Sequence, residues 1–248
     1  MSSANPGRGV AASAPEPSSA PVARISASAV ARNAYIAISR VPAGTRVVAD
    51  LRADAWGHGA LAVAAELLAA GVDTLRVDDA PAAHLLTDAG VSGATTVDPP
   101  GLDSLTLFGL PGGARDATPA MRLSGTVLSV KSLRLGEGVS YGYAFRAATD
   151  TRVALVSGGY AQGVVRALGG RARVTIDGVP HPIVGRVAMD VCVVDIGAEP
   201  VERGDEAVFF GDPRHDEPSL AEWVAATGLE AAELVTAVGL RATREHAA

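Results

Sequence analysis

The spacing of apolar residues changes near residue 120, and this change restricts the possible folds more than any other feature of the chain. Before residue 120, short apolar runs suited to buried strands alternate with Ala/Leu-rich runs of helical spacing that end at glycines. The strand-like runs are residues 46–51 and 74–77, and the helical runs are 58–70 and 80–89. This alternation predicts a parallel α/β unit, with one further strand at 105–110.

After residue 120, apolar residues recur with a period of two, which is typical of strands with one buried face. The clearest case is residues 171–184, where two such runs flank Asp177-Gly178, a dipeptide that favours a type I′ hairpin turn. The sequence therefore predicts an α/β domain over residues 23–119 and a β-rich domain over residues 120–248.

The two ends of the chain differ in character. Residues 1–22 are rich in Ala, Ser, Pro and Gly and have almost no bulky apolar side chains, so we expect a disordered tail and not an export signal. Near the other end, two helices are predicted. The first is capped by Ser219 in a capping box with Glu222, and the second ends near Gly239.

Composition excludes several classes of function. The net charge of −6 provides no basic surface for nucleic acid or anionic membranes. No apolar run approaches the roughly 18 residues of a membrane span. The single cysteine, Cys192, cannot form an internal disulfide and suits a cytoplasmic location. No Cys/His cluster has metal-ligand spacing, so no metal site is expected.

Three glycine-punctuated segments carry the strongest functional signal: 138–142 (Gly-Val-Ser-Tyr-Gly), 158–166 (Gly-Gly-Tyr-Ala-Gln-Gly-Val-Val-Arg) and 184–190 (Val-Gly-Arg-Val-Ala-Met-Asp). Their order and spacing resemble the C-terminal domain of alanine racemase, a pyridoxal phosphate enzyme. The resemblance places Tyr141 where that family has its catalytic tyrosine. It also places Met189 and Asp190 at the entrance of the partner subunit's active site.

Other residues of these segments match the family less completely. Tyr160 and Arg166 occupy matching positions, for which we favour structural roles, whereas Gln162 stands where the family has an aspartate. Residues 242–246 replace a segment that usually ends in an Arg-Tyr pair.

The N-terminal half resembles the same family with a gap. Residues 46–59 end in Arg-Ala-Asp-Ala-Trp-Gly-His-Gly, which is similar to the family's Lys-Ala-(Asn/Asp)-Ala-Tyr-Gly-His-Gly. Residues 107–111 look like its last barrel strand. A complete (β/α)8 barrel takes about 200–250 residues, and residues 23–115 are too few for one. The predicted fold is therefore a partial, truncated racemase-type barrel followed by a β-rich racemase C-terminal domain.

The resemblance puts Arg52 at the position of the lysine that holds pyridoxal phosphate. A guanidinium stays protonated and delocalised, so it neither forms the Schiff base readily nor accepts the α-proton. Trp56 replaces a tyrosine whose hydroxyl reaches the cofactor phosphate, and His58 near a helix start is a weak candidate for an anion. For both we favour packing roles. Lys131, the only lysine of the chain, is the alternative Schiff-base amine but is predicted to be a solvated strand residue.

Three functions follow from the resemblance. The leading hypothesis is a racemase homologue with little or no activity, because Arg52 replaces the cofactor lysine. The second is a non-catalytic subunit that supplies Tyr141 to a full-length racemase, and the third is an active alanine racemase. The resemblance implies pyridoxal phosphate as cofactor, a homodimer or such a heterodimer as assembly, and a small amino acid as substrate if the protein is active.

Overall fold

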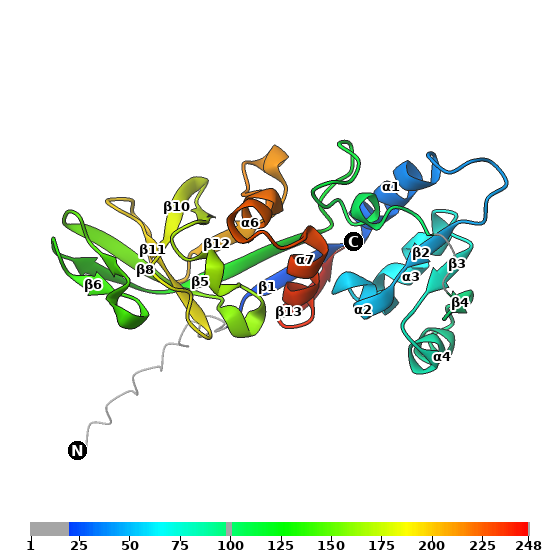
Figure 1. The fold of residues 1–248 in the computed structure, drawn as a ribbon, viewed down its shortest axis with the longest axis horizontal. Coiled ribbons are helices and arrows are strands. Elements are labelled where there is room, and N and C mark those ends of the chain that lie inside the picture. The colour runs from blue at the N-terminus through cyan, green and yellow to red at the C-terminus, as the bar shows by residue number, and fades with distance from the viewer. Residues whose placement is uncertain (1–19, 98–100, 248) are drawn as a thin grey trace, which may run out of the picture.

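The structure is a computed structural model that describes residues 20–97 and 101–247, apart from the side chain of Tyr141. Its C-terminal part is a β-barrel in which six antiparallel strands close into a ring in the order β5-β8-β11-β10-β9-β12 and back to β5. The strands are β5 (Met121–Leu133), β8 (Thr151–Ser157), β9 (Arg173–Ile176), β10 (Val179–Val184), β11 (Val191–Asp195) and β12 (Glu206–Phe210). Figure 1 shows this part on the left.

The predicted hairpin forms between β9 and β10. Asp177 and Gly178 both have positive φ, 47° and 77°, as a type I′ turn requires, and Ile176 pairs with Val179 across it. A smaller hairpin of β6 (Gly138–Val139) and β7 (Phe145–Arg146) extends the barrel at one end. The 3-10 helix η1 (Tyr141–Tyr143) joins its two strands.

Two helices cover the barrel, α6 (Leu220–Thr227) and α7 (Ala231–Gly239), so the second ends where predicted. Ser219 caps α6 by accepting a hydrogen bond from the Ala221 N–H at 3.1 Å. The reciprocal bond of a capping box is made at the next helix instead, where the Glu230 N–H donates to Glu233 at 2.9 Å. Trp223 of α6 is 1% exposed and packs against Phe209 and Phe210 of β12.

The N-terminal part contains a three-stranded parallel sheet in the order β2-β3-β4, with strands β2 (Val48–Asp50), β3 (Thr74–Arg76) and β4 (Ala94–Thr95). Its helices are α1 (Ala27–Ile38), α3 (Ala60–Ala69) and α4 (Ala80–Asp88). Three parallel strands are far fewer than the eight of a closed barrel. The prediction of a truncated α/β barrel is confirmed.

The strand predicted at residues 105–110 is wrong, because this segment begins as the short helix α5 (Ser104–Leu107). Asp103 caps the helix by accepting from the Leu105 N–H at 3.1 Å, and Gly109 ends it with a φ of 63°. Leu107 and Phe108 are fully buried all the same. A short buried apolar run has the same composition in a helix and in a strand, so its periodicity did not distinguish them.

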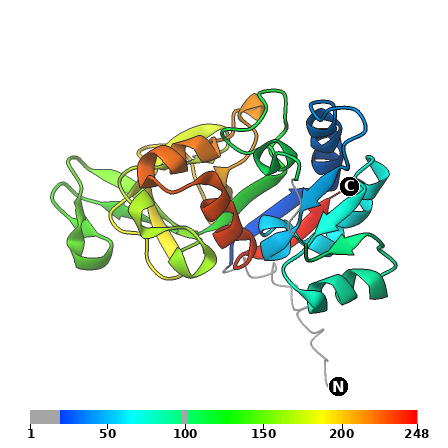
Figure 2. The same ribbon diagram turned by 45° about the vertical axis from the view of Figure 1, so that its right-hand side comes forward.

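The two ends of the described chain meet beside the barrel. Strand β1 (Val22–Ser26) pairs antiparallel with β5 and parallel with β13 (Thr243–Ala247), and Figure 2 shows β1 in blue beside β13 in red. Val22, which we assigned to the disordered tail, therefore belongs to a strand; residues 1–19 lie outside the described residues. The division at residues 119 and 120 stays a prediction.

In the described part of the chain, no helix is long and apolar enough to cross a membrane. The same residues contain no group of three His, Cys, Asp or Glu side chains arranged to hold a metal ion.

Candidate functional site

The residues after Arg52 form one turn of left-handed helix, a rare conformation for residues other than glycine. Ala53, Asp54, Ala55 and Trp56 have φ values of 51°, 55°, 56° and 53°. Each such residue costs roughly 1–2 kcal/mol, because its Cβ approaches the following carbonyl oxygen. The turn follows the carboxyl end of β2, the edge at which parallel sheets usually bind ligands. We therefore take this turn as the first candidate site.

Local hydrogen bonds stabilise the left-handed turn. The Ala53 N–H donates to Asp78 Oδ2 at 2.8 Å, and the Ala60 N–H donates to Asp54 Oδ1 at 2.7 Å. The Asp54 carboxylate thus accepts a hydrogen bond from a backbone N–H at the start of α3, as an N-cap side chain does. The Gly59 N–H also donates to the Asp54 carbonyl at 2.9 Å.

The C-terminal strand β13 holds the same turn from the other side. Arg244 forms a short ion pair with Asp54 and donates to the Gly57 carbonyl at 3.3 Å. His246 Nε2 lies 3.0 Å from the His58 carbonyl oxygen. These contacts join residues about 190 positions apart. The segment that departs from the family's usual ending therefore stabilises the turn here.

Arg52 lies at the start of this turn, and its guanidinium faces Asp50. Arg52 Nε donates to Asp50 Oδ1 at 3.0 Å and Nη2 donates to Oδ2 at 2.9 Å. Arg76 of β3 also donates to Asp50 Oδ2. Burial raises the pKa of the Asp50 carboxyl, but hydrogen bonds from Arg52 and Arg76 outweigh it and lower the pKa to about 2. Asp50 is therefore a carboxylate that occupies the fork of Arg52.

Trp56 and His58 pack against Phe108, the residue that follows α5. The Trp56 ring centroid lies 5.8 Å from that of Phe108, and the His58 ring stacks on Phe108 at 4.2 Å. His58 is fully buried, and burial lowers its pKa to about 4 despite a hydrogen bond from its ring to the Ala55 carbonyl. A neutral, buried imidazole offers no positive charge to an anion, so the geometry supports the packing roles.

Tyr141 lies on η1 at the far end of the β6–β7 hairpin, and its side chain lies outside the described residues. The preceding residue, Ser140, anchors this loop to the barrel. Ser140 Oγ accepts from the Arg186 N–H at 2.6 Å and lies 3.1 Å from the Arg186 carbonyl, to which it donates. The backbone around Tyr141 is thereby tied to the segment that contains Met189 and Asp190.

Met189 and Asp190 lie in a loop that is joined to the Tyr160 segment. The Tyr160 N–H donates to the Ala188 carbonyl at 3.0 Å, and Gln162 Nε2 donates to Asp190 Oδ1 at 2.9 Å. Met189 is 55% exposed, and Asp190 is exposed as well. Gln162 thus gives the Asp190 carboxylate a neutral hydrogen-bond donor.

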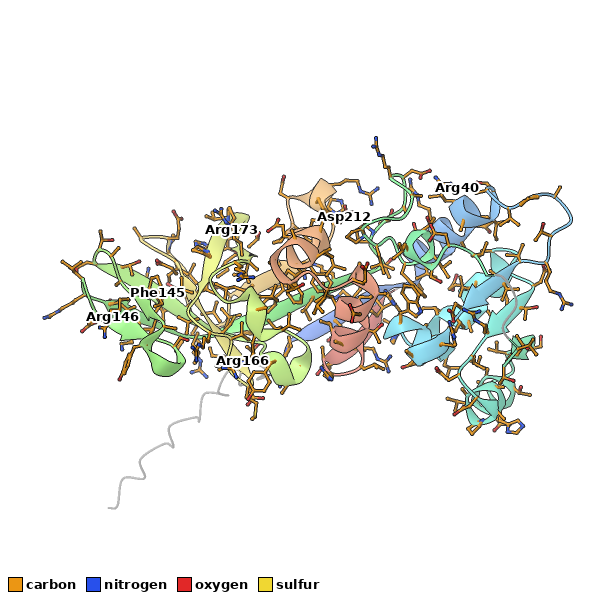
Figure 3. The ribbon with its side chains drawn as sticks, viewed as in Figure 1. Arg40, Phe145, Arg146, Arg166, Arg173 and Asp212 are labelled. Carbon is orange, nitrogen blue, oxygen red and sulfur yellow. The ribbon has the colours of Figure 1, made fainter. Side chains whose placement is uncertain are left out.

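Arg166 extends this surface, because its guanidinium lies 5.4 Å above the centre of the Tyr160 ring. Figure 3 shows Arg166 on the lower side of the barrel, away from the N-terminal part. This cation–π contact supports the structural roles expected for Tyr160 and Arg166.

The structure does not bring the predicted site residues together in one chain. Arg52, Trp56 and His58 form one group around α2 (Arg52–Trp56), whereas Tyr141 lies in η1, between β6 and β7. Figure 1 shows β6 at the end of the barrel that is far from α2. Lys131 is an exposed residue of β5 that pairs with Val153 of β8. A site that combines the two groups therefore requires a second chain.

Sequence reasoning missed the partners of the turn. Asp50 could have been identified as a candidate from the sequence, because it lies at the carboxyl end of a predicted parallel strand, and ligands usually bind at that edge of a parallel sheet. Arg76 follows the same rule on the neighbouring strand. Arg244 and His246 had no such signal, since their contacts depend on the parallel pairing of β13 with β1.

Comparisons with known proteins agree with these features. The family model described as "Alanine racemase, C-terminal domain" matches residues 120–246, and "Alanine racemase, N-terminal domain" matches residues 25–110. The curated alanine racemase of Mycobacterium leprae is 46% identical over 130 residues, which are 52% of this chain and 34% of that protein. The alanine racemase of Thermobifida fusca is 42% identical over 148 residues, 59% of this chain and 40% of that protein. The chain thus matches little more than a third of the length of these relatives.

Solved structures show the same fold. Alanine racemase from Streptomyces lavendulae superposes with a TM-score of 0.83 at 22% identity, covering 92% of this chain and 97% of that chain. Alanine racemase from Bartonella henselae, solved with covalently bound pyridoxal phosphate, superposes with a TM-score of 0.76 at 17% identity, covering 92% and 99%. At such identities the likeness concerns the fold alone.

Proposed function

Because this chain belongs to the alanine racemase family, we propose that it is a family member that does not interconvert L- and D-alanine by itself. One observation carries the proposal: the position matched to the cofactor lysine is Arg52, and the fork of its guanidinium is bonded to Asp50 at 2.9 and 3.0 Å. A guanidinium in a bidentate ion pair is neither a nucleophilic amine nor a proton acceptor.

The residues present do not fit covalently bound pyridoxal phosphate. The cofactor supplies the electron sink for this family's chemistry, and it is held through a lysine amine. Lys131 is an exposed residue of the barrel strand β5, whereas the turn belongs to the N-terminal part, and His58 is buried and neutral. We therefore derive no catalytic step through the cofactor.

The test is a pyridoxal phosphate titration of the purified protein, followed by borohydride reduction and mass spectrometry. We expect no visible absorbance band of an internal aldimine, no adduct on Lys131, and no D-alanine above background. The matched variant Arg52→Lys restores an amine at the same position, so an adduct in this variant alone would assign the loss to Arg52. An adduct on Lys131 together with D-alanine formation would contradict the proposal.

A second candidate function is a subunit that completes the site of a full-length racemase. It is favoured by the contrast between two groups of residues: the motif around Arg52 differs from the family's, while the segments with Tyr141, Met189 and Asp190 keep the family's residues. Met189 and Asp190 are exposed. In this hypothesis the face with Met189 and Asp190 covers the partner's site and contributes Tyr141.

Coexpression with a full-length racemase tests the second candidate. A pull-down should recover a complex, and Met189→Glu should weaken it because the change places a charge on the proposed contact face. Leu61→Glu is a suitable control, since Leu61 is also an exposed apolar residue (45%) but lies on α3 in the N-terminal part. Equal recovery of both variants would count against this face as the contact.

We also propose that the protein functions in the cytoplasm as a dimer, with a small amino acid as substrate if any activity exists. The reduced state expected of Cys192, its one cysteine, suits that compartment. Light scattering of the purified protein measures the oligomeric state, and a strict monomer would contradict the dimer.

A further inference from the structure

A groove of about 650 Å³ lies on the barrel, between the β6–β7 hairpin and the β9–β10 hairpin. Its size is within the range of small-molecule sites, roughly 300–1,000 Å³. Phe145 of β7 lines one side, and Arg173 at the start of β9 lines the other (Figure 3). None of Arg52, Tyr141, Met189 and Asp190, the residues on which the proposed functions rest, lines this groove.

Close backbone approaches permitted by glycine shape this groove. A Cβ at Gly169 would lie 2.2 Å from the Gly185 carbonyl oxygen, and a Cβ at Gly185 would lie 2.3 Å from Ser140 Cβ. Both are impossible contacts, so three loops meet here only because two of the residues have no side chain. The side chains that follow these glycines, among them Arg171 and Arg186, then surround the groove.

The groove is positively charged in a chain whose net charge is −6. Its charged lining residues are Arg171, Arg173 and Arg186 against one acid, Asp195. Asp195 Oδ1 already accepts from the Thr151 hydroxyl at 2.6 Å and from the Gly197 N–H at 3.2 Å.

The guanidinium groups of this groove are available for a ligand. Arg171 donates to the Ala226 carbonyl at 3.0 Å, which leaves its charge uncompensated. Among the described residues, the Arg173 and Arg186 side chains form no hydrogen bond or ion pair. All three arginines are exposed. Like charges gathered on one small surface repel each other, and a bound anion would relieve this repulsion.

We propose that this groove binds a small phosphorylated molecule with an apolar body. Guanidinium forks match phosphate oxygens bidentately, which favours a phosphate over a single carboxylate where several arginines converge. Phe145, Pro182 and Val184 provide an apolar wall beside the arginines. The proposal is independent of racemase chemistry, because it involves neither Arg52 nor a cofactor lysine.

Titration calorimetry with phenyl phosphate tests the proposal on the full chain. We expect saturable binding that weakens about tenfold in Arg173→Gln and in Arg186→Gln, since each loses a charge-assisted hydrogen bond. Arg46→Gln removes the same charge from an exposed arginine of the N-terminal part and should leave affinity unchanged. Affinity should also fall between pH 7 and pH 5, because the phosphate loses charge near its second pKa of about 6 while arginine does not titrate.

Several results would overturn the proposal. The first is the absence of saturable binding, and the second is an equal effect of Arg46→Gln, which would indicate non-specific charge attraction. The third concerns a second copy of the chain: if phenyl phosphate does not bind and Arg173→Gln dissociates an oligomer in light scattering, the groove is a protein interface.

Discussion

Replacement of Asp50 by Asn should destabilise the protein measurably, although the side chain changes by only one atom. Asp50 has 6% side-chain exposure and accepts hydrogen bonds from two arginines, Arg52 and Arg76. Asn cannot neutralise them, and its amide presents a donor where a carboxylate oxygen accepted one. Arg76, with a side chain only 13% exposed, then keeps a charge that lacks its carboxylate.

The magnitude follows from the carboxyl pKa. A change from the ordinary value of 3.8 to about 2 corresponds to about 2 kcal/mol, at roughly 1.4 kcal/mol for each pKa unit. Arg52 is 47% exposed, so solvent screens its share and Arg76 supplies the larger part. A chain of this size loses about 2 °C in Tm for each kcal/mol. We therefore expect Asp50→Asn to lower Tm by about 4 °C at pH 7.

The pH dependence of the unfolding free energy tests whether the Asp50 carboxylate is the cause of the difference. Since the folded pKa of Asp50 is lowered, its contribution is present above pH 3.8 and is lost as the pH falls toward about 2. Urea unfolding at pH 7 and pH 3.5 should therefore show a smaller difference between wild type and variant at the lower pH.

Asp116→Asn is the matched control for this experiment. Asp116 pairs with Arg40 at 3.1 Å, but both side chains are more than half exposed, so its loss should cost well under about 1 kcal/mol. The reasoning is refuted if Asp50→Asn costs no more than Asp116→Asn, or if its effect is the same at both pH values.

Three further predictions rest on single residues. Gly159→Ala should lower the unfolding free energy by about 1–3 kcal/mol, because its Cβ would lie 2.2 Å from the Met189 carbonyl oxygen; denaturant titration measures this, and an unchanged midpoint would contradict it. Burial holds the His58 pKa at about 4, so the unfolding free energy should fall as the pH drops from 6.5 toward 4, and His58→Phe should flatten this fall; an equally steep fall in the variant would assign it to other groups. Burial raises the pKa of the Cys192 thiol to about 12, so a thiol reagent should label it only after unfolding; rapid labelling of the native protein would disprove the burial.

Much of the fold followed from local sequence patterns. One example is the type I′ hairpin at Asp177-Gly178, and another is the change from an α/β to a β-rich pattern near residue 120. Both depend on backbone stereochemistry and on the spacing of buried residues, and these can be read from residues that are close together in the sequence. For residues 105–110 the local pattern predicted the wrong element, because a short buried apolar run is compatible with a helix as well as with a strand.

The chemistry available at position 52 was also determined by the sequence, because an arginine side chain offers a guanidinium and no nucleophilic amine in any fold. Only the tertiary structure decided what Arg52 contacts and how far Tyr141 lies from it. Arg76 reaches Asp50, the carboxylate that Arg52 also binds, because β2 and β3 pair in parallel, and Arg244 reaches Asp54 because β13 pairs with β1. Such contacts join residues that are distant in the chain, and a one-dimensional pattern contains no record of which strands will pair.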